Sequence, residues 1–269
     1  MKKNPTISIK ILLLLVVFTY NMSSCDYEEF KPTEYTASKL YMPAAVRGVF
    51  TIDNVPQRVE WLPTPGYEYD FKIDKENNKF IVPLGVYRSG IERKGNINVN
   101  IEVRNDTINM LRLSEEIPES TEILPASQYN LPTSVTVEDG RELGGFDLEI
   151  NLDYLLSRPN EIFALGVGIS SDELEVNMSI STTIIVIYTK LLIPTADFSY
   201  SINGKTVTFS NNSTFGMNYF WNFGDGERRT VKNLSHTYSS SGNYIVTLTT
   251  KGILGSMNQA IAEKVVVIP

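Results

Sequence analysis

The residue types that most often carry chemistry in proteins are scarce in this chain of 269 residues. Cys25 is the single cysteine and His236 the single histidine, which excludes a disulfide framework, a cysteine-based zinc site and any site that needs two imidazoles. The residue spacing contains no Gly-x-Ser-x-Gly elbow, glycine-rich phosphate loop or His-Glu-x-x-His motif. We therefore expect no metal site and no cofactor.

Carboxylates are the other groups that could support catalysis, because glycosidases place two of them across a cleft. The only dense group of carboxylates consists of Glu115, Glu116, Glu119 and Glu122. Pro118 and Ser120 interrupt this group, and no apolar residues surround it as a pocket would require. The pattern is typical of a solvated loop, and we predict that the protein is not an enzyme.

Residues 1–24 have the order of a secretory signal. Lys2, Lys3 and Lys10 make its start positive, and the apolar run at 11–19 has about half of the roughly 20 residues that span a bilayer. Cys25 follows Ser23 and Ser24, at the place where a signal peptidase cuts. This arrangement resembles a bacterial lipobox, which implies that Cys25 becomes an acylated N-terminus; the alternative is a free buried cysteine.

Acidic residues outnumber basic ones after that point. Residues 1–24 carry three lysines and no acid, so their removal changes the formal net charge from −7 to −10. This balance argues against a nucleic-acid partner, which needs clustered lysine and arginine. In the segment 25–34, an expected tether, Asp26, Glu28 and Glu29 resemble the export signal of Bacteroidetes-type lipoproteins. The resemblance implies a lipid anchor in the outer membrane, with the protein facing the cell exterior.

The hydrophobic period along the rest of the chain is two, which indicates strands covered on one face. Ile97, Val99 and Ile101 alternate with polar residues, and the stretches 146–152 and 244–248 repeat the pattern. The β-branched runs 184–188 and 265–268 predict strands covered on both faces or lying in a sandwich core. Helices are expected only at residues 107–113 and 152–157.

The C-terminal residues carry a recurrent pattern of motifs. Tyr219-Phe220-Trp221-Asn222-Phe223-Gly224-Asp225-Gly226 is followed by His236-Thr237-Tyr238 and by Gly242-Asn243-Tyr244-Ile245-Val246-Thr247-Leu248. These motifs resemble a polycystic kidney disease (PKD) domain over residues 195–269. The resemblance implies an immunoglobulin-like β-sandwich used as a spacer or adhesion module. Pro194 ends an expected linker, residues 191–194.

The roles of the motif residues follow from their types. Trp221 and Phe223 share one strand face and are expected in the core, and Gly224 and Gly226 permit backbone angles closed to other residues. His236, two residues before Tyr238, is expected to satisfy backbone groups rather than to catalyse. Asn222 stands where most members of the family have Asp, which weakens any calcium site near Asp225.

Residues 35–190 resemble a second family, the N-terminal domain of unknown function of Bacteroidetes surface lipoproteins. The resemblance rests on Leu40-Tyr41-Met42-Pro43, on Val82-Pro83-Leu84-Gly85-Val86-Tyr87-Arg88-Ser89-Gly90 and on the late strand at 184–188. It implies a place in polysaccharide-utilisation systems. We therefore expect an all-β fold, with two β-sandwich, immunoglobulin-like domains in tandem after the lipoprotein signal peptide.

Carbohydrate binding needs an exposed aromatic ring with polar groups around it. Trp61, beside a turn-rich stretch, is the residue that a loop could present in this way, with a core position as the alternative. Tyr67, Tyr69 and Phe71 alternate with acids and are expected to share one strand face, as core residues. We expect a non-catalytic surface lipoprotein that binds carbohydrate or acts as a spacer in glycan capture. The alternative is a structural or adhesive protein whose partner is another protein, such as an outer-membrane transporter or a host matrix component.

Overall fold

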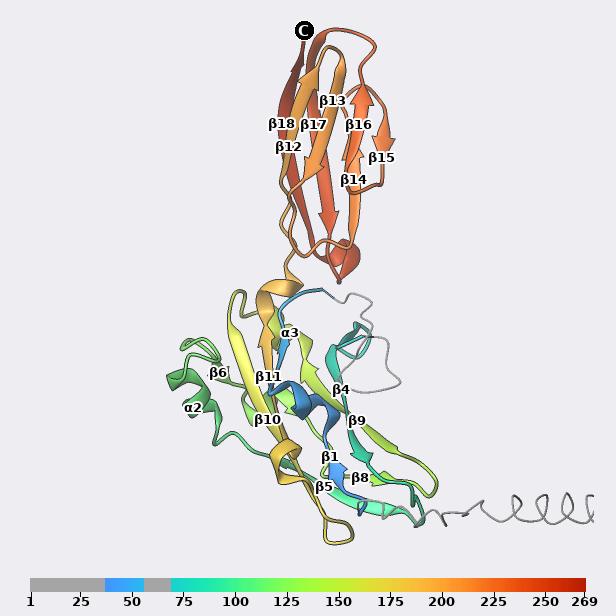
Figure 1. Ribbon diagram of the computed structural model, residues 1–269. Coiled ribbons are helices and arrows are strands. Elements are labelled where there is room, and N and C mark those ends of the chain that lie inside the picture. Colours follow the sequence, from blue (N-terminus) through green and yellow to red (C-terminus); the bar gives the residue numbers. More distant parts are fainter. Residues whose placement is uncertain (1–36, 56–68) are drawn as a thin grey trace, which may run out of the picture. The chain divides into compact units, whose positions relative to one another are not determined.

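The computed structural model of the chain describes residues 37–55 and 69–269 (Figure 1). Cys25, Asp26, Glu28, Glu29 and Trp61 lie outside the described residues. Strands predominate in the described part, whose only α-helices are α2 (Ile108–Leu113) and α3 (Leu152–Leu156). None of the described helices is long and apolar enough to cross a membrane.

Residues 40–188 form two sheets, which we call the N-terminal sandwich (Figure 1). One sheet has the order β1-β4-β9-β7 with β3 beside β4, from strands β1 (Leu40–Tyr41), β3 (Lys72–Asp74), β4 (Lys79–Arg88), β7 (Tyr129–Asn130) and β9 (Leu143–Asn151). The other has the order β2-β11-β10-β5-β8 with β6 beside β10, from strands β2 (Val49–Ile52), β5 (Ile97–Val103), β6 (Glu122–Ile123), β8 (Ser134–Val137), β10 (Ile162–Ser170) and β11 (Thr182–Tyr188).

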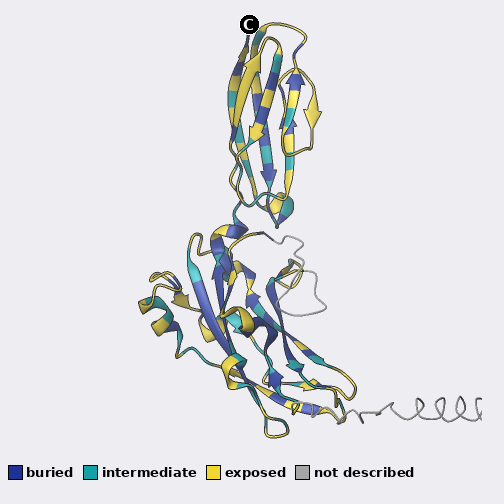
Figure 2. Cartoon of the chain, viewed as in Figure 1, coloured by how far each residue is buried: buried dark blue, intermediate teal, exposed yellow. Residues whose placement is uncertain are grey.

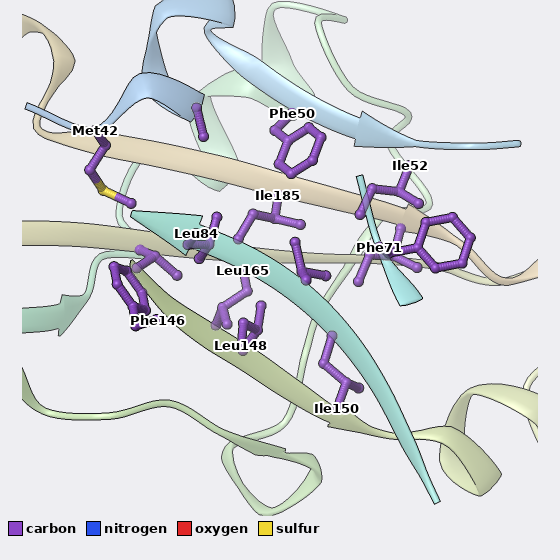
Figure 3. Packing of buried hydrophobic residues seen from close by; sticks show 14 of the residues in the cluster. Met42, Phe50, Ile52, Phe71, Leu84, Phe146, Leu148, Ile150, Leu165 and Ile185 are labelled. Atoms are coloured by element: carbon purple, nitrogen blue, oxygen red, sulfur yellow. The ribbon is translucent and has the colours of Figure 1, made fainter. Parts of the chain in front are cut away.

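Alternate residues of both sheets fill the space between them. Leu84 of β4 and Leu148 of β9 point toward Leu165 of β10 and Ile185 of β11 (Figure 3), and all four belong to one buried cluster. Period-two strands can bury one face in this way while the other stays polar. The alternating pattern therefore positions the core as the sequence predicts.

Strand β11 is covered on both faces, as its continuous run of β-branched residues predicts. Ile185 and Ile187 enter the core between the sheets, while Ile184 and Val186 face a smaller cluster with Ile108 of α2. The helix α2 lies within the expected stretch 107–113. It supplies the apolar cover that the outer face of β11 needs.

The remaining helical turns are short. Asn151 begins α3, because its side-chain oxygen accepts a hydrogen bond from the Tyr154 amide at 3.1 Å, a typical N-cap. The 3₁₀ turns are η1 (Pro43–Arg47), η2 (Ala126–Gln128), η3 (Met178–Ile180), η4 (Thr189–Leu192) and η5 (Gly255–Met257). Turn η4 overlaps the expected linker, whose limits stay a prediction.

Residues 198–268 form a second pair of sheets, which we call the C-terminal sandwich. One sheet has the order β12-β13-β16, from β12 (Phe198–Asn203), β13 (Thr206–Asn211) and β16 (Leu234–Thr237). The other has the order β15-β14-β17-β18, from β14 (Asn218–Asn222), β15 (Arg228–Arg229), β17 (Gly242–Lys251) and β18 (Gln259–Ile268). The fold class is therefore the expected one, all-β with two β-sandwiches.

Aromatic rings fill the core of the C-terminal sandwich. Trp221 is 1% exposed and packs edge-on against Phe198, with ring centroids 5.1 Å apart. Phe209 lies between Trp221 and Phe223, at 5.4 and 5.5 Å. The Trp221 indole N–H donates to the Val231 carbonyl at 2.9 Å, so the one polar atom of this ring is satisfied.

Of the two arrangements expected for residues 265–268, strand β18 has the place in a sandwich core and is not covered on both faces. Val265 and Val267 are 54% and 57% exposed, whereas Val266 and Ile268 are buried, so burial alternates along the strand (Figure 2). The reason is that β18 pairs only with β17, at the edge of its sheet, and one face has no neighbouring layer among the described residues.

Candidate functional site

The glycine turn at residues 224–226 of the C-terminal sandwich is held by a carboxylate and an imidazole. Asp225 Oδ2 lies 2.6 Å from His236 Nε2, and Asp225 Oδ1 accepts a hydrogen bond from the Glu227 amide at 3.0 Å. The His236 ring stacks on Phe223 with centroids 4.2 Å apart. His236 thus has a side-chain partner, where the sequence predicts backbone partners.

The electrostatics of this pair fit a structural role. Burial raises the pKa of the Asp225 carboxyl, but the hydrogen bonds from His236 and from the Glu227 amide together lower this pKa by a larger amount. The net shift is therefore downward. Burial, and then the charge of Asp225, raise the pKa of Tyr238 to about 12. The Tyr238 hydroxyl donates to the Phe223 carbonyl at 3.1 Å. Both Asp225 oxygens are used within the protein, which leaves little for a cation.

The turn itself needs glycine. Gly224 has φ +80°, and a Cβ there would lie 2.7 Å from the Ile245 carbonyl oxygen, so a larger residue would clash with backbone. Gly226 has φ +99°. Asn222 Oδ1 accepts from the Gly224 amide at 3.2 Å and so closes the turn. These contacts stabilise the conformation of the turn.

The acid-rich loop does not form a catalytic pair. Its four carboxylates are all exposed, at Glu115, Glu116, Glu119 and Glu122. Within residues 37–55 and 69–269, no three acidic, cysteine or histidine side chains come close enough to hold a metal ion.

One hollow in the N-terminal sandwich lies beside the connection between β8 and β9. Its volume is about 680 Å³. We call it the Arg93 hollow, and its lining consists of Arg93, Thr136, Glu138, Gly140, Arg141, Glu142, Leu143, Gly144 and Gly145. The lining is mostly polar, with two cations, two carboxylates and exposed glycine backbone.

A hydrogen bond connects the wall of this hollow to Tyr87, whose ring contacts Tyr41. The Tyr87 hydroxyl donates to Glu142 Oε2 at 2.5 Å, and Arg93 forms an ion pair with Oε1 of the same carboxylate. The rings of Tyr41 and Tyr87 lie 5.2 Å apart at an angle of 47°. Arg93 and Glu142 keep 40% and 36% of their side-chain surface exposed. Arg93, Glu142 and Tyr87 are therefore bonded to one another, while Arg93 and Glu142 stay accessible to a ligand.

The Glu142 carboxylate also acts on the tyrosine hydroxyls. The hydrogen bond to Glu142, and then burial, raise the pKa of Tyr87. Burial, and then the Glu142 charge, raise the pKa of Tyr41. Both hydroxyls are consequently neutral hydrogen-bonding groups at physiological pH.

Strand register brings these residues together. Tyr41 of β1 pairs with Tyr87 of β4, and Tyr87 pairs with Leu143 of β9, so the three form one row across the sheet. The loop that carries Arg93 is tied to the β8–β9 connection, because the Gly140 amide donates to the Arg93 carbonyl at 2.8 Å. Sequence reasoning missed this site, since Tyr41 and Tyr87 lie in the quoted motifs but Arg93 and Glu142 do not.

A smaller hollow of about 260 Å³ lies near the start of β4 and the end of β9. It is lined largely by amides, but several of these serve the fold. Asn151 caps α3 and accepts from Asn78 at 3.2 Å, and Asn130 donates to Glu149 at 3.2 Å. Fewer free polar groups remain here than at the Arg93 hollow.

Tyr69 and Phe71, which the sequence predicts on one face of a strand, do not share a face. Trp61 and Tyr67 lie outside the described residues. Tyr69 is 41% exposed while Phe71 is 2% exposed and stacks on Phe80 at 4.5 Å, so the expectation that they share a core face is wrong. The described chain bends at Tyr69 and Asp70, and β3 begins only at Lys72. The bend breaks the alternation that the prediction assumed.

Two family models match the chain. The PKD domain model matches residues 194–267, which contain the whole C-terminal sandwich except Ile268. A second model, described as an N-terminal domain, matches residues 62–176 in the N-terminal sandwich. The chain is thus similar to PKD domains in its C-terminal part and to a separate N-terminal domain family before it. No curated protein matches the chain.

Several solved structures are similar to this chain or to part of it. The PKD1 domain of the Vibrio cholerae metalloprotease PrtV is 28% identical, with 28% of this chain and 96% of that chain covered and a TM-score of 0.27. An auxiliary nutrient-binding protein from Bacteroides thetaiotaomicron is 17% identical, with coverages of 81% and 70% and a TM-score of 0.36. A candidate carbohydrate-binding protein from Bacteroides ovatus is 11% identical, with coverages of 86% and 70% and a TM-score of 0.39. Likenesses at these TM-scores assign no function.

Proposed function

We propose that the protein is a non-catalytic, lipid-anchored surface protein that binds carbohydrate through the Arg93 hollow. The observation that carries the proposal is the linked group of Tyr87, Glu142 and Arg93, of which Arg93 and Glu142 line a hollow of about 680 Å³ and Tyr87 is bonded to Glu142. Aromatic rings and charged hydrogen-bonding groups on one open surface are the requirements of a sugar site.

Each member of the group has a part in this function. The half-buried rings of Tyr41 and Tyr87 offer apolar surface to the C–H face of a sugar. Glu142 accepts hydrogen bonds from hydroxyls, and Arg93 donates in a fixed planar fork. Trp61 stays a further predicted ligand residue.

The anchoring part of the proposal rests on the sequence. Cys25 takes the lipid, and Asp26, Glu28 and Glu29 direct the protein to the outer face of the outer membrane. The PKD-like part then serves as a spacer, since its motif residues bind one another. Both family matches support this division of roles.

Binding of neutral polysaccharides by residues 26–269 tests the proposal. Glu142→Gln is expected to weaken binding about tenfold and leave the melting temperature nearly unchanged, because a solvent-exposed ion pair contributes only about 0–1 kcal/mol to stability. Glu119→Gln, in the exposed acidic loop, is the matched control and should bind as wild type. If no neutral polysaccharide binds at millimolar concentration, or if both variants behave alike, the proposal fails.

A second candidate function, docking of a partner protein, is favoured by one surface. Ile245, Ile261, Val265 and Val267 are 54–60% exposed on the outer face of β17 and β18. Contiguous exposed aliphatic residues often mark protein contacts. Val265→Lys should abolish capture of a surface partner by the intact anchored protein while Glu142→Gln leaves it unchanged.

A further inference from the structure

The C-terminal sandwich has a hollow that the proposed function does not use. It has a volume of about 380 Å³. We call it the Phe220 hollow, and its lining consists of Phe220, Trp221, Asn222, Arg228, Arg229, Thr230, Thr247 and Thr249. Trp221 is a core residue, so the side chains available to a ligand are an aromatic ring, an amide, hydroxyls and guanidinium groups.

Strand register lays these groups out in rows on the outer face of the sheet. Asn222 of β14 pairs with Arg228 of β15 on one side and with Thr247 of β17 on the other, which forms a polar row. Phe220 pairs with Thr249 in the next row. Trp221 lies between the two rows in sequence and points into the core, so Phe220 and Asn222 must point outward. Phe220 is 39% exposed.

Two cations flank these rows. Lys251 Nζ lies 4.7 Å from the centroid of the Phe220 ring and donates to Ser256 Oγ at 3.2 Å. Arg228 is exposed, and no carboxylate of the described residues lies within ion-pair distance of its guanidinium. Its neighbour Arg229 does have such a partner, Glu227, at 2.8 Å. Arg228 therefore presents an uncompensated positive charge.

One carboxylate lies further along the same polar row. Glu263 of β18 pairs with Thr247 and continues the polar row. It is three strand spacings from Arg228, or roughly 14 Å at about 4.8 Å per strand. At physiological salt the screening length is about 8 Å, so Glu263 reduces the positive potential at Arg228 only slightly.

We propose that the Phe220 hollow binds an acidic polysaccharide, a sugar chain that carries carboxylate or sulfate groups. Arg228 pairs with one anionic group and Lys251 with another. Their backbone positions are about four residues apart in the register of β14, or roughly 13 Å, and Lys251 Nζ extends back over the Phe220 ring. A chain of more than one sugar unit is needed to reach both. Phe220 and Thr249 lie between the two cations along the strands, and Asn222 and Thr247, in the same row as Arg228, bind ring hydroxyls.

The polar row is what favours a sugar over an acidic peptide. A peptide anchors through apolar side chains in pockets, whereas the amide of Asn222 and the hydroxyls of Thr247 and Thr249, on the same face as two cations, match a ligand with hydroxyls along its whole length. The exposed aliphatic residues of the same face lie on β17 (Ile245) and on β18 (Ile261, Val265 and Val267). The site is separate from the Arg93 hollow, so its test is independent of the proposed function.

Titration calorimetry of residues 26–269 tests the inference with four polymers: polygalacturonate, dextran sulfate, neutral dextran and polyglutamate. We expect polygalacturonate, dextran sulfate or both to bind, and neutral dextran not to bind. Because polygalacturonate carries carboxylates and dextran sulfate carries sulfates, comparing these two polymers distinguishes carboxylate from sulfate recognition. Arg228→Gln should weaken binding roughly fivefold or more, and Lys251→Gln by a similar factor. Raising the salt should weaken the wild type more than either variant.

Lys232→Gln is the matched control, because it removes the same charge from an exposed residue outside the hollow and should bind as wild type. Glu142→Gln should also leave this binding unchanged. Arg228 makes no side-chain bond within the described residues, so Arg228→Gln decides the matter even if Lys251→Gln proves unstable. The inference is overturned if neither acidic polysaccharide binds, if Arg228→Gln binds as wild type, or if polyglutamate binds as tightly, which would indicate an acidic protein partner.

Discussion

Asp225 and His236, eleven residues apart, are joined through Oδ2 and Nε2 at 2.6 Å in the turn region of the C-terminal sandwich. Their side chains are 18% and 9% exposed, so the contact is largely shielded from water. Phe223 stacks on the imidazole, and Tyr238 packs against it edge-on at 4.6 Å. The pair therefore connects the glycine turn after β14 to strand β16.

This contact makes stability depend on pH in the acid range. The pKa of Asp225 is lowered in the folded state, so its contribution is present above the unfolded value of about 3.9 and is lost as pH falls through the folded value. We expect the free energy of unfolding to decline below about pH 4. Urea unfolding from pH 7 to pH 2.5 measures it.

The variant Asp225→Asn isolates the contribution of this carboxyl. It should cost about 1–3 kcal/mol at pH 7, and its stability should fall less steeply in acid than that of the wild type. Glu263→Gln removes an exposed carboxylate of the same sandwich and serves as control. Parallel acid profiles for wild type and Asp225→Asn would contradict the assignment.

Trp221 is the core residue whose loss should be most damaging in the C-terminal sandwich. Trp221→Ala should cost on the order of 3–5 kcal/mol, because it leaves a cavity and an unpaired Val231 carbonyl. Phe220→Ala, the adjacent residue on the opposite face, is the control and should cost much less. Thermal melts of both variants check the difference; a Trp221→Ala melt equal to wild type would mean that the ring is not core.

Cys25 is the residue on which anchoring depends. Cys25→Ser should abolish membrane association and leave unprocessed or soluble protein, because a lipid chain supplies most of the binding energy of such an anchor. Metabolic labelling with a fatty-acid analogue is the measurement. Equal labelling of the variant and the wild type would remove the lipoprotein assignment.

The variant Trp61→Ala tests whether Trp61 is a ligand residue or a core residue. If it stacks on sugar, Trp61→Ala should weaken polysaccharide binding and leave the melting curve unchanged. A core tryptophan would instead lower stability along with binding. Titration and melting of the same preparation separate the two, and Tyr69→Ala, at an exposed ring nearby in sequence, is a suitable comparison.

The local pattern of the sequence was sufficient for the strands, the short helices and the C-terminal core. The alternation of Ile97, Val99 and Ile101 corresponds to β5, and the spacing of Trp221 and Phe223 places both rings inside. These features depend on neighbours within a few residues, because side-chain direction repeats every second residue in a strand.

The two hollows were decided by tertiary structure alone. Tyr41, Tyr87 and Glu142 are distant in sequence and meet only because β1, β4 and β9 pair in one register, while Arg93 follows shortly after β4 and is tied to the β8–β9 connection. Phe220 and Arg228 share a face through the pairing of β14 with β15 and β17. The exposure of Val265 likewise follows from the place of β18 at a sheet edge. Register and strand order are long-range properties, and a one-residue shift would turn each of these side chains to the opposite face.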